Sequence, residues 1–91
     1  MTKFTIYTEQ KNTSLVHRLA HMHLGDFTLI EAKGNWGSVR ENTIIIEHFI
    51  EETNNKTLSR ACIRRLVRDI NAVNSQTCCL VIEQQMKGAF V

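Results

Sequence analysis

The fold is decided by two consecutive stretches, residues 43–50, which read TIIIEHFI, and residues 56–73, which read KTLSRACIRRLVRDINAV. The first is rich in β-branched and aromatic residues and predicts a central strand. In the second, apolar residues recur every three to four positions, which predicts a long amphipathic helix from about Lys56 to Val73. Asn55 or Thr57 is the expected N-cap of this helix.

The flanking stretches predict the remaining elements. Alternation of residue types in residues 3–8 predicts a first strand. Asn12 and Thr13 can cap a helix that ends at about Leu24, with Gly25 as its C-cap. Residues 27–32 predict a second strand, residues 38–42 a polar turn, and residues 77–83 the last strand.

The order β-α-β-β-α-β predicts an α+β fold, the ferredoxin-like split β-α-β sandwich, with two helices on one face of a four-stranded antiparallel sheet. A chain of 91 residues has room for one domain, residues 1–91. On this reading the apolar residues of the helix-covered face are Phe4, Ile6, Ile44, Ile46, Leu80 and Ile82.

The other face of the sheet is left bare and also carries apolar residues. Its expected members are Tyr7, Ile45, Phe49 and Val81, beside the polar Thr5, Glu47 and Glu83. Apolar side chains gathered on an exposed face usually mark an interface. We therefore expect a homodimer that forms through this face or through an edge strand.

Composition excludes several classes of protein. The formal net charge of +2 excludes a histone-like or polybasic tail. No apolar run approaches the roughly 20 residues that span a bilayer, and the first ten residues do not resemble a signal peptide. The odd number of cysteines, three, argues against a disulfide scaffold. We therefore expect a soluble cytoplasmic protein with reduced thiols and no membrane partner.

Residues 27–91 resemble small uncharacterised ferredoxin-like proteins that are common in phage and bacterial genomes. The resemblance lies in the turn Gly34-Asn35-Trp36-Gly37, the acidic Glu41, the strand Ile44-Ile45-Ile46-Glu47, the second helix, and residues 79–83 (CLVIE). It implies a phage or mobile-element setting, and it brings no catalytic residues.

The most distinctive chemical feature of the sequence is a basic helix face, which we call the arginine face. Its residues are Lys56, Arg60, Arg64, Arg65 and Arg68, and Asp69 is the one acid in the body of that helix. Such a face can contact phosphate oxygens or an acidic protein surface. It can equally be a solvated helix face that binds nothing, because arginine is a good helix former.

Metal binding and catalysis find little support in the sequence. His17 and His21 are one helical turn apart, with His23 nearby, but nothing aligns them with a third ligand, and Cys62 and Cys78 are expected on core faces. No phosphate loop and no nucleophile motif occurs. The bare sheet face offers Tyr7 and Phe49, but the third strand lacks the Lys/Arg-Gly-aromatic signature of an RNA-binding sheet, and Glu47 and Glu83 would repel phosphate. We therefore expect no metal, no cofactor and no enzymatic activity.

Trp36 lies between Gly34 and Gly37 and has two interpretations. It can be an exposed anchor for a partner, or it can fold over the sheet edge and pack, with the glycines allowing the turn. Packing is the preferred interpretation.

The leading hypothesis from the sequence is a small non-enzymatic binding protein, a homodimer that engages or inhibits a host protein through the arginine face. One alternative is a nucleic-acid-binding module that uses the same face. Another is a protein that binds a small anionic ligand, such as a nucleotide, at a subunit interface.

Overall fold

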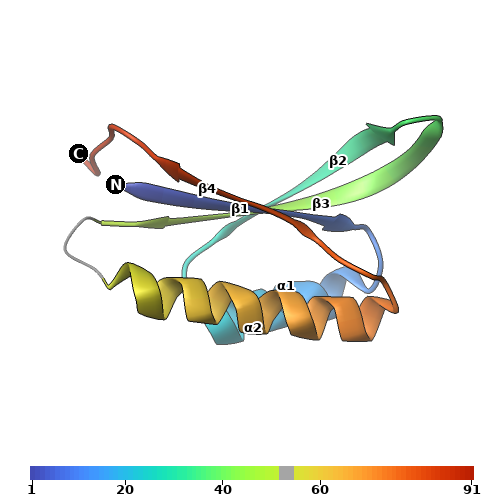
Figure 1. Cartoon of the computed structure of the whole chain (residues 1–91), viewed down its shortest axis with the longest axis horizontal. Coiled ribbons are helices and arrows are strands. Elements are labelled where there is room, and N and C mark those ends of the chain that lie inside the picture. Colours follow the sequence, from blue (N-terminus) through green and yellow to red (C-terminus); the bar gives the residue numbers. More distant parts are fainter. Residues whose placement is uncertain (52–54) are drawn as a thin grey trace.

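The computed structural model describes residues 1–51 and 55–91, and it has the predicted order of elements (Figure 1). The elements are β1 (Thr2–Glu9), α1 (Thr13–Leu24), β2 (Thr28–Trp36), β3 (Val39–Ile50), α2 (Lys56–Asn74) and β4 (Leu80–Gln85). All neighbouring strands are antiparallel, in the order β2-β3-β1-β4. Both helices lie on one side of the sheet. The predicted ferredoxin-like α+β fold is therefore confirmed.

The ends of the helices follow from local side-chain chemistry. Asn55 caps α2, because its side-chain oxygen accepts a hydrogen bond of 3.2 Å from the backbone N–H of Leu58. Gly25, with φ of 74°, ends α1 as predicted. Asn12 precedes α1, but its side chain does not cap that helix. Its Nδ2 instead donates to the backbone oxygen of Val73 at 3.0 Å, which joins the start of α1 to the end of α2.

The core lies between the helices and the covered face of the sheet. The sheet contributes buried side chains from β1 and β3, namely Phe4, Ile6, Ile44, Ile46 and Ile50. The helices contribute Val16, Ala20, Ile63, Leu66 and Ile70. Three apolar helix residues, which the helical spacing places on the same arcs as the core residues, are exposed: Leu15, Met22 and Leu58. At 100° per residue they lie toward the edges of the apolar arcs.

The β2–β3 hairpin is longer than predicted. Residues 38–42 were expected to form a turn, but β3 begins at Val39, which pairs with Trp36. The hairpin extends beyond the ends of both helices (Figure 1). Its polar residues can therefore occupy a strand and still remain in water.

The predicted orientation of the last strand is wrong. Val81 is opposite Ile6 and Glu83 is opposite Phe4, so these two residues lie on the helix side of the sheet. Leu80 and Ile82 are opposite Tyr7 and Thr5, on the bare face. Alternation divides a strand into two sets of residues but does not say which set faces the helices. The set with Leu80 and Ile82 is the more apolar and was therefore expected against the helices. In the structure the set with Val81 and Glu83 lies there instead, and Glu83 is paired with Arg60.

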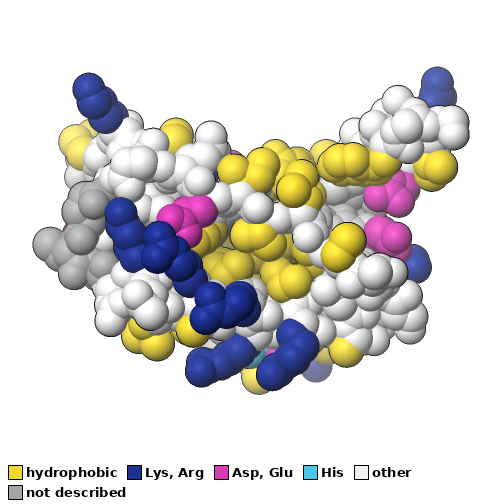
Figure 2. Space-filling model, in the orientation of Figure 1, with side chains coloured by type: hydrophobic (Ala, Val, Ile, Leu, Met, Phe, Trp, Pro, Cys, Tyr) yellow, Lys and Arg dark blue, Asp and Glu magenta, His cyan; other side chains and the backbone are white. Residues whose placement is uncertain are grey.

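The strand β4 is an edge strand, and every residue in it is exposed. Between β4 and α2 runs a groove of about 530 Å³, lined by Ile63, Val67 and Val81 and flanked by Arg64, Arg68 and Asn71. Figure 2 shows hydrophobic side chains in the hollow between these two elements. No helix among the described residues is long and apolar enough to cross a membrane.

Candidate functional site

The arginine face is an exposed surface on α2, but part of its charge is already paired (Figure 2). Arg60 donates two hydrogen bonds of 2.7 Å to the carboxylate of Glu83. This contact raises the pKa of Arg60 and lowers the pKa of Glu83. Arg68 Nε lies 3.3 Å from Asp69 Oδ1, and Lys56 Nζ donates to Gln85 Oε1 at 3.1 Å.

Arg64 and Arg65 complete the arginine face. Neither makes an ion pair with any other residue in the described part of the chain. The incorrect orientation of β4 explains why the pairing was not foreseen, because Glu83 was expected on the opposite side of the sheet. The arginine face is thus less basic than its sequence suggests.

Three of the four residues predicted for the bare sheet face do lie on it. Tyr7 and Ile45 are directly opposite each other on β1 and β3, and Phe49 is opposite Lys3. Val81 lies on the other side, as described above. Homodimerisation through this face stays a prediction, because a single chain does not test it.

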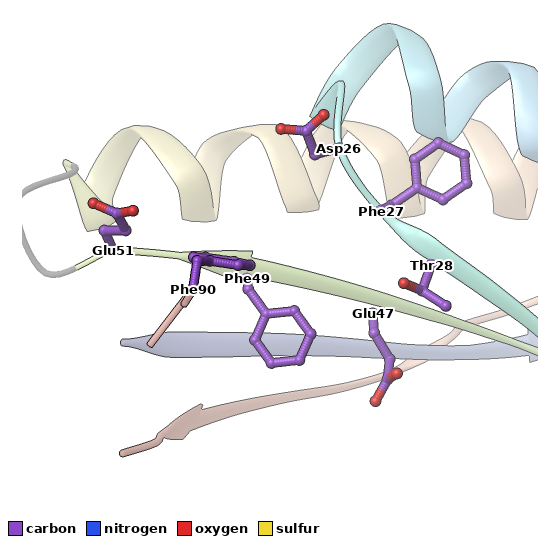
Figure 3. Close-up of a pocket in the computed structure, with 7 residues that line it drawn as sticks. All are labelled: Asp26, Phe27, Thr28, Glu47, Phe49, Glu51 and Phe90. Atoms are coloured by element: carbon purple, nitrogen blue, oxygen red, sulfur yellow. The ribbon is translucent and has the colours of Figure 1, made fainter. Parts of the chain in front are cut away.

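One pocket of about 400 Å³ lies where β3 extends beyond the start of β2, and it combines three carboxylates with three aromatic rings (Figure 3). The carboxylates do not point toward one another. In Figure 3, Asp26 and Glu51 point to the helix side of β3, whereas Glu47 points away from the helices. Glu47 is also paired with Lys3 at 3.4 Å. This pocket therefore presents no common centre for a cation.

A second pocket lies at the opposite end of the bare face, and we call it the open-face pocket. It has a volume of about 190 Å³. It is lined by residues from all four strands and from the segment before β4, namely Tyr7, Thr8, Glu9, Trp36, Glu41, Thr43, Cys78 and Leu80. The strand register brings them together, because Glu9 is opposite Thr43 and Tyr7 is opposite Leu80. Two carboxylates and two aromatic rings thus share one small cavity.

The open-face pocket contains buried polar atoms without hydrogen-bond partners. Among the described residues, three buried side-chain oxygens accept or donate no hydrogen bond, Thr5 Oγ1, Glu9 Oε2 and Thr43 Oγ1. Two of the three belong to residues that line this pocket. Buried polar groups are normally paired, so unpaired ones concentrated in a cavity indicate a place where a ligand can bind.

Trp36 forms one wall of the open-face pocket, and Gly34 makes its position possible. A Cβ on Gly34 would lie 2.5 Å from Nε1 of Trp36 and 2.6 Å from Oγ1 of Thr43. The indole therefore folds back across Gly34 toward Thr43, which agrees with the packed interpretation of this residue. The ring nevertheless stays 45% exposed, so Trp36 packs on one side and can contact a ligand with the other.

The histidines are used in separate contacts. His17 packs edge-on against Phe27, with ring centroids 5.0 Å apart. Nε2 of His23 lies 2.8 Å from Asp69 Oδ2, and this contact lowers the pKa of Asp69. Nδ1 of His48 lies 2.6 Å from the backbone oxygen of Asp26. Within residues 1–51 and 55–91, no group of three or more possible ligands could hold a metal ion.

The cysteines have different surroundings, and one was placed incorrectly from the sequence. Cys78 is exposed and lies on the open-face pocket, whereas a core position was expected. Burial raises the pKa of Cys79, whose Sγ lies near Asn71 Oδ1 and Gln76 Nε2. Cys79 is therefore a poor nucleophile.

Sequence reasoning missed Glu9, Glu41 and Thr43 as site residues. Glu9 and Thr43 are ordinary polar residues in strands, with no motif around them, and Glu41 was noted only as part of the resemblance to phage proteins, without a role. The available signal was positional, because polar residues at alternate positions of a strand lie on one face. That signal becomes a site only when the register between strands is known.

No protein-family model matches the chain, and no curated protein sequence matches it. Solved structures do resemble it. A phage SAM lyase in complex with S-methyl-5'-thioadenosine superimposes with a TM-score of 0.73 and 16% sequence identity, covering 92% of this chain and 80% of that chain. A phage SAM lyase in the apo state has the same TM-score and identity, covering 91% and 78% of the two chains.

These structures contradict the hypothesis of a non-enzymatic binding protein. Both solved structures named above cover more than nine-tenths of this chain, and both are structures of a SAM lyase, which is an enzyme. The hypothesis relied on the absence of sequence motifs for catalysis. Carboxylates and aromatic rings that come together only through strand pairing leave no motif in the sequence. The absence of catalytic motifs was therefore not evidence against an enzyme.

Proposed function

We propose that the chain is an enzyme that binds S-adenosylmethionine (SAM) in the open-face pocket and cleaves it as a lyase. The observation that carries this proposal is the meeting of Glu9, Glu41, Tyr7 and Trp36 in one cavity on the bare sheet face. The shared fold with phage SAM lyases supports it. Glu41 is also part of the stretch through which the sequence resembles phage proteins.

The charge and the rings of the pocket suit a sulfonium cation. SAM carries a positive charge on sulfur, and nearby carboxylates attract that charge. The faces of Tyr7 and Trp36 can add a cation–π attraction, which contributes about 0.5–2 kcal/mol. Arginine side chains would repel the sulfonium cation, so the arginine face does not suit this substrate.

The bond changes during cleavage of SAM determine whether the pocket residues contribute to substrate binding or to the rate. When the bond between sulfur and the aminobutyryl carbon breaks, both electrons stay on sulfur, and S-methyl-5'-thioadenosine results as a neutral thioether. A lyase adds no water, so the electrons that the carbon chain loses are replaced from within that chain, by its own carboxylate or by loss of a proton. Contacts to the sulfonium therefore hold the substrate, whereas the rate depends on how well the reacting chain is positioned.

The proposal is tested by incubating the purified chain with SAM and measuring S-methyl-5'-thioadenosine by chromatography. We expect the thioether to accumulate in proportion to the amount of protein. Glu41→Gln removes a carboxylate from the pocket and should lower kcat/KM about 10-fold, because one charge contact of roughly 1.4 kcal/mol is lost.

The matched control is Glu31→Gln, which neutralises an exposed glutamate on the helix side of β2, opposite Ile44. This variant should keep the wild-type rate. The proposal is wrong if the folded wild-type chain forms no thioether, and the site is misplaced if both variants lose activity equally.

A further inference from the structure

Thr43 carries a hydroxyl that the protein itself leaves without a partner. Its side chain is only 3% exposed and lines the open-face pocket. Oγ1 makes no hydrogen bond within the described part of the chain. A buried unpaired hydroxyl costs stability, and a valine of the same shape would avoid that cost. Because this unpaired hydroxyl belongs to a residue that lines a pocket, it points to a hydrogen bond made with a bound ligand.

A hydrogen-bond acceptor lies beside this hydroxyl. Glu9 is directly opposite Thr43 in the paired strands, so both side chains lie on the bare face. Oε2 of Glu9 is buried and accepts no hydrogen bond from the described residues. Nζ of Lys11 lies 2.9 Å from it as an ion pair, without hydrogen-bond geometry. This oxygen can still accept a bond from a ligand.

A second donor faces the same space. Nε1 of Trp36 and Oγ1 of Thr43 lie within 2.6 Å of one point beside Gly34, where a side chain is missing. An indole N–H can only donate a hydrogen bond. Trp36 makes no side-chain hydrogen bond with another residue in the part of the chain that the structure describes, and its 45% exposed ring leaves the N–H open to a ligand or to water. Two donors, Trp36 Nε1 and Thr43 Oγ1, therefore lie beside Gly34. The acceptor, Glu9 Oε2, belongs to the neighbouring strand β1, where Glu9 is opposite Thr43.

A ligand group that matches this arrangement has acceptors at one end and a cationic donor at the other. An α-amino acid group has both, since its carboxylate accepts and its ammonium donates. The volume also limits the ligand, because about 190 Å³ is below the roughly 300–1,000 Å³ of pockets that enclose whole drug-sized molecules. One end of a nucleoside substrate fits, and the whole molecule does not.

We propose that the open-face pocket binds the amino-acid end of the sulfonium substrate and that Thr43 is a specificity-determining residue for it. Thr43 and Trp36 donate to the carboxylate, and Glu9 accepts from the ammonium. The adenosine end then extends out of the pocket. This inference rests on the proposed function and adds which part of the substrate the pocket recognises.

The test compares two ligands by isothermal titration calorimetry. S-adenosylhomocysteine contains the amino-acid end, and S-methyl-5'-thioadenosine lacks it. Thr43→Val should weaken binding of S-adenosylhomocysteine about 10-fold, because a hydrogen bond to a charged group is lost. It should leave binding of S-methyl-5'-thioadenosine within about twofold. Thr43→Ser keeps the hydroxyl and should restore most of the affinity.

The chain offers a matched control in Thr5→Val. Thr5 is on β1 and lies on the same face of the sheet as Thr43. It is 4% exposed and also has an unpaired buried Oγ1, but it does not line the pocket. This variant should change the affinity for neither ligand. Thermal unfolding should show that both valine variants are at least as stable as the wild type.

The outcomes separate this inference from the proposed function. If Thr43→Val weakens both ligands equally, or weakens neither, the assignment of the amino-acid end is wrong while SAM binding stands. If the folded wild type binds neither ligand, the proposed function fails, and this inference fails with it.

Discussion

The arginine face of α2 and the open-face pocket differ in how their polar groups are satisfied. On the arginine face, Arg60 is held by Glu83 in two hydrogen bonds, and Arg68 is close to Asp69. In the open-face pocket, oxygens of Glu9 and Thr43 are buried without hydrogen-bond partners. Glu9 Oε2 is still ion-paired with Lys11 Nζ at 2.9 Å, so the buried group of this pocket that has no partner of either kind among the described residues is the hydroxyl of Thr43.

This difference teaches where to look for a ligand site in a small fold. Exposed charges are solvated by water and contribute little, whether or not they are paired. A buried polar group has no such alternative, so leaving it unpaired costs free energy. Such a cost indicates a candidate ligand site where the unpaired group also lines a pocket, as Thr43 does and Thr5 does not.

The largest expected effect comes from filling the space beside Gly34. Gly34→Ala would place a Cβ 2.5 Å from Trp36 Nε1 and 2.6 Å from Thr43 Oγ1. Because Thr43 is buried and branched, we expect a loss of about 2 kcal/mol in the free energy of unfolding, as for other overpacked sites. Chemical denaturation measures this loss, and product formation from SAM should fall with it.

The control for this substitution is Gly88→Ala. A Cβ there would meet Met1 Sδ at 3.6 Å, which is ordinary van der Waals contact. Its stability should match the wild type. If Gly34→Ala is as stable and active as Gly88→Ala, the indole does not need its place over Gly34.

The second effect is a gain in stability. Thr43→Val and Thr5→Val each replace a buried unpaired hydroxyl with a methyl group, and each should raise the free energy of unfolding by about 1 kcal/mol. Urea denaturation measures the gain. Only Thr43→Val should also lose affinity for the substrate. A loss of stability in both variants would mean that the two hydroxyls are already hydrogen-bonded in solution.

The third effect concerns the paired carboxylates on the helix side. Contact with Arg60 lowers the pKa of Glu83 below its ordinary value of 4.5, and contact with His23 lowers the pKa of Asp69 below 3.8. These groups therefore add stability above their unfolded pKa values, and the contribution is lost as the pH falls through the lower folded values.

Thermal unfolding between pH 7 and pH 3 checks this expectation. Glu83→Gln should melt at a lower temperature than the wild type at pH 7, and the two curves should converge as the pH approaches 3. A difference that stays constant over this range would show that the Glu83 charge does not stabilise the fold.

The smallest effect is expected on the arginine face itself. Arg64→Ala and Arg65→Ala remove exposed side chains that form no ion pair with the described residues. Stability should change by no more than about 0.5 kcal/mol. The rate of SAM cleavage should also stay unchanged. A large loss of activity in either variant would show that the arginine face takes part in substrate binding or catalysis.

The parts of the fold that were predictable depend on contacts close in sequence. The helix at Lys56–Asn74 was found from its apolar spacing, and Asn55 from its capping chemistry. The start of β3 at Val39 and the orientation of β4 were missed. Both features depend on pairing with another strand. The local residue pattern in β3 and β4 does not show which partner strand they pair with, so it could not predict either feature.

The sequence by itself determined the order of elements, the fold class and the members of the core on β1 and β3, because periodicity and capping act within one element. Only the tertiary structure decided that Glu83 neutralises Arg60 and that Glu9, Thr43, Trp36 and Gly34 meet. These residues belong to different strands and helices. Their proximity is set by strand register and by which side of the sheet the helices cover, and neither is encoded in any single stretch of the chain.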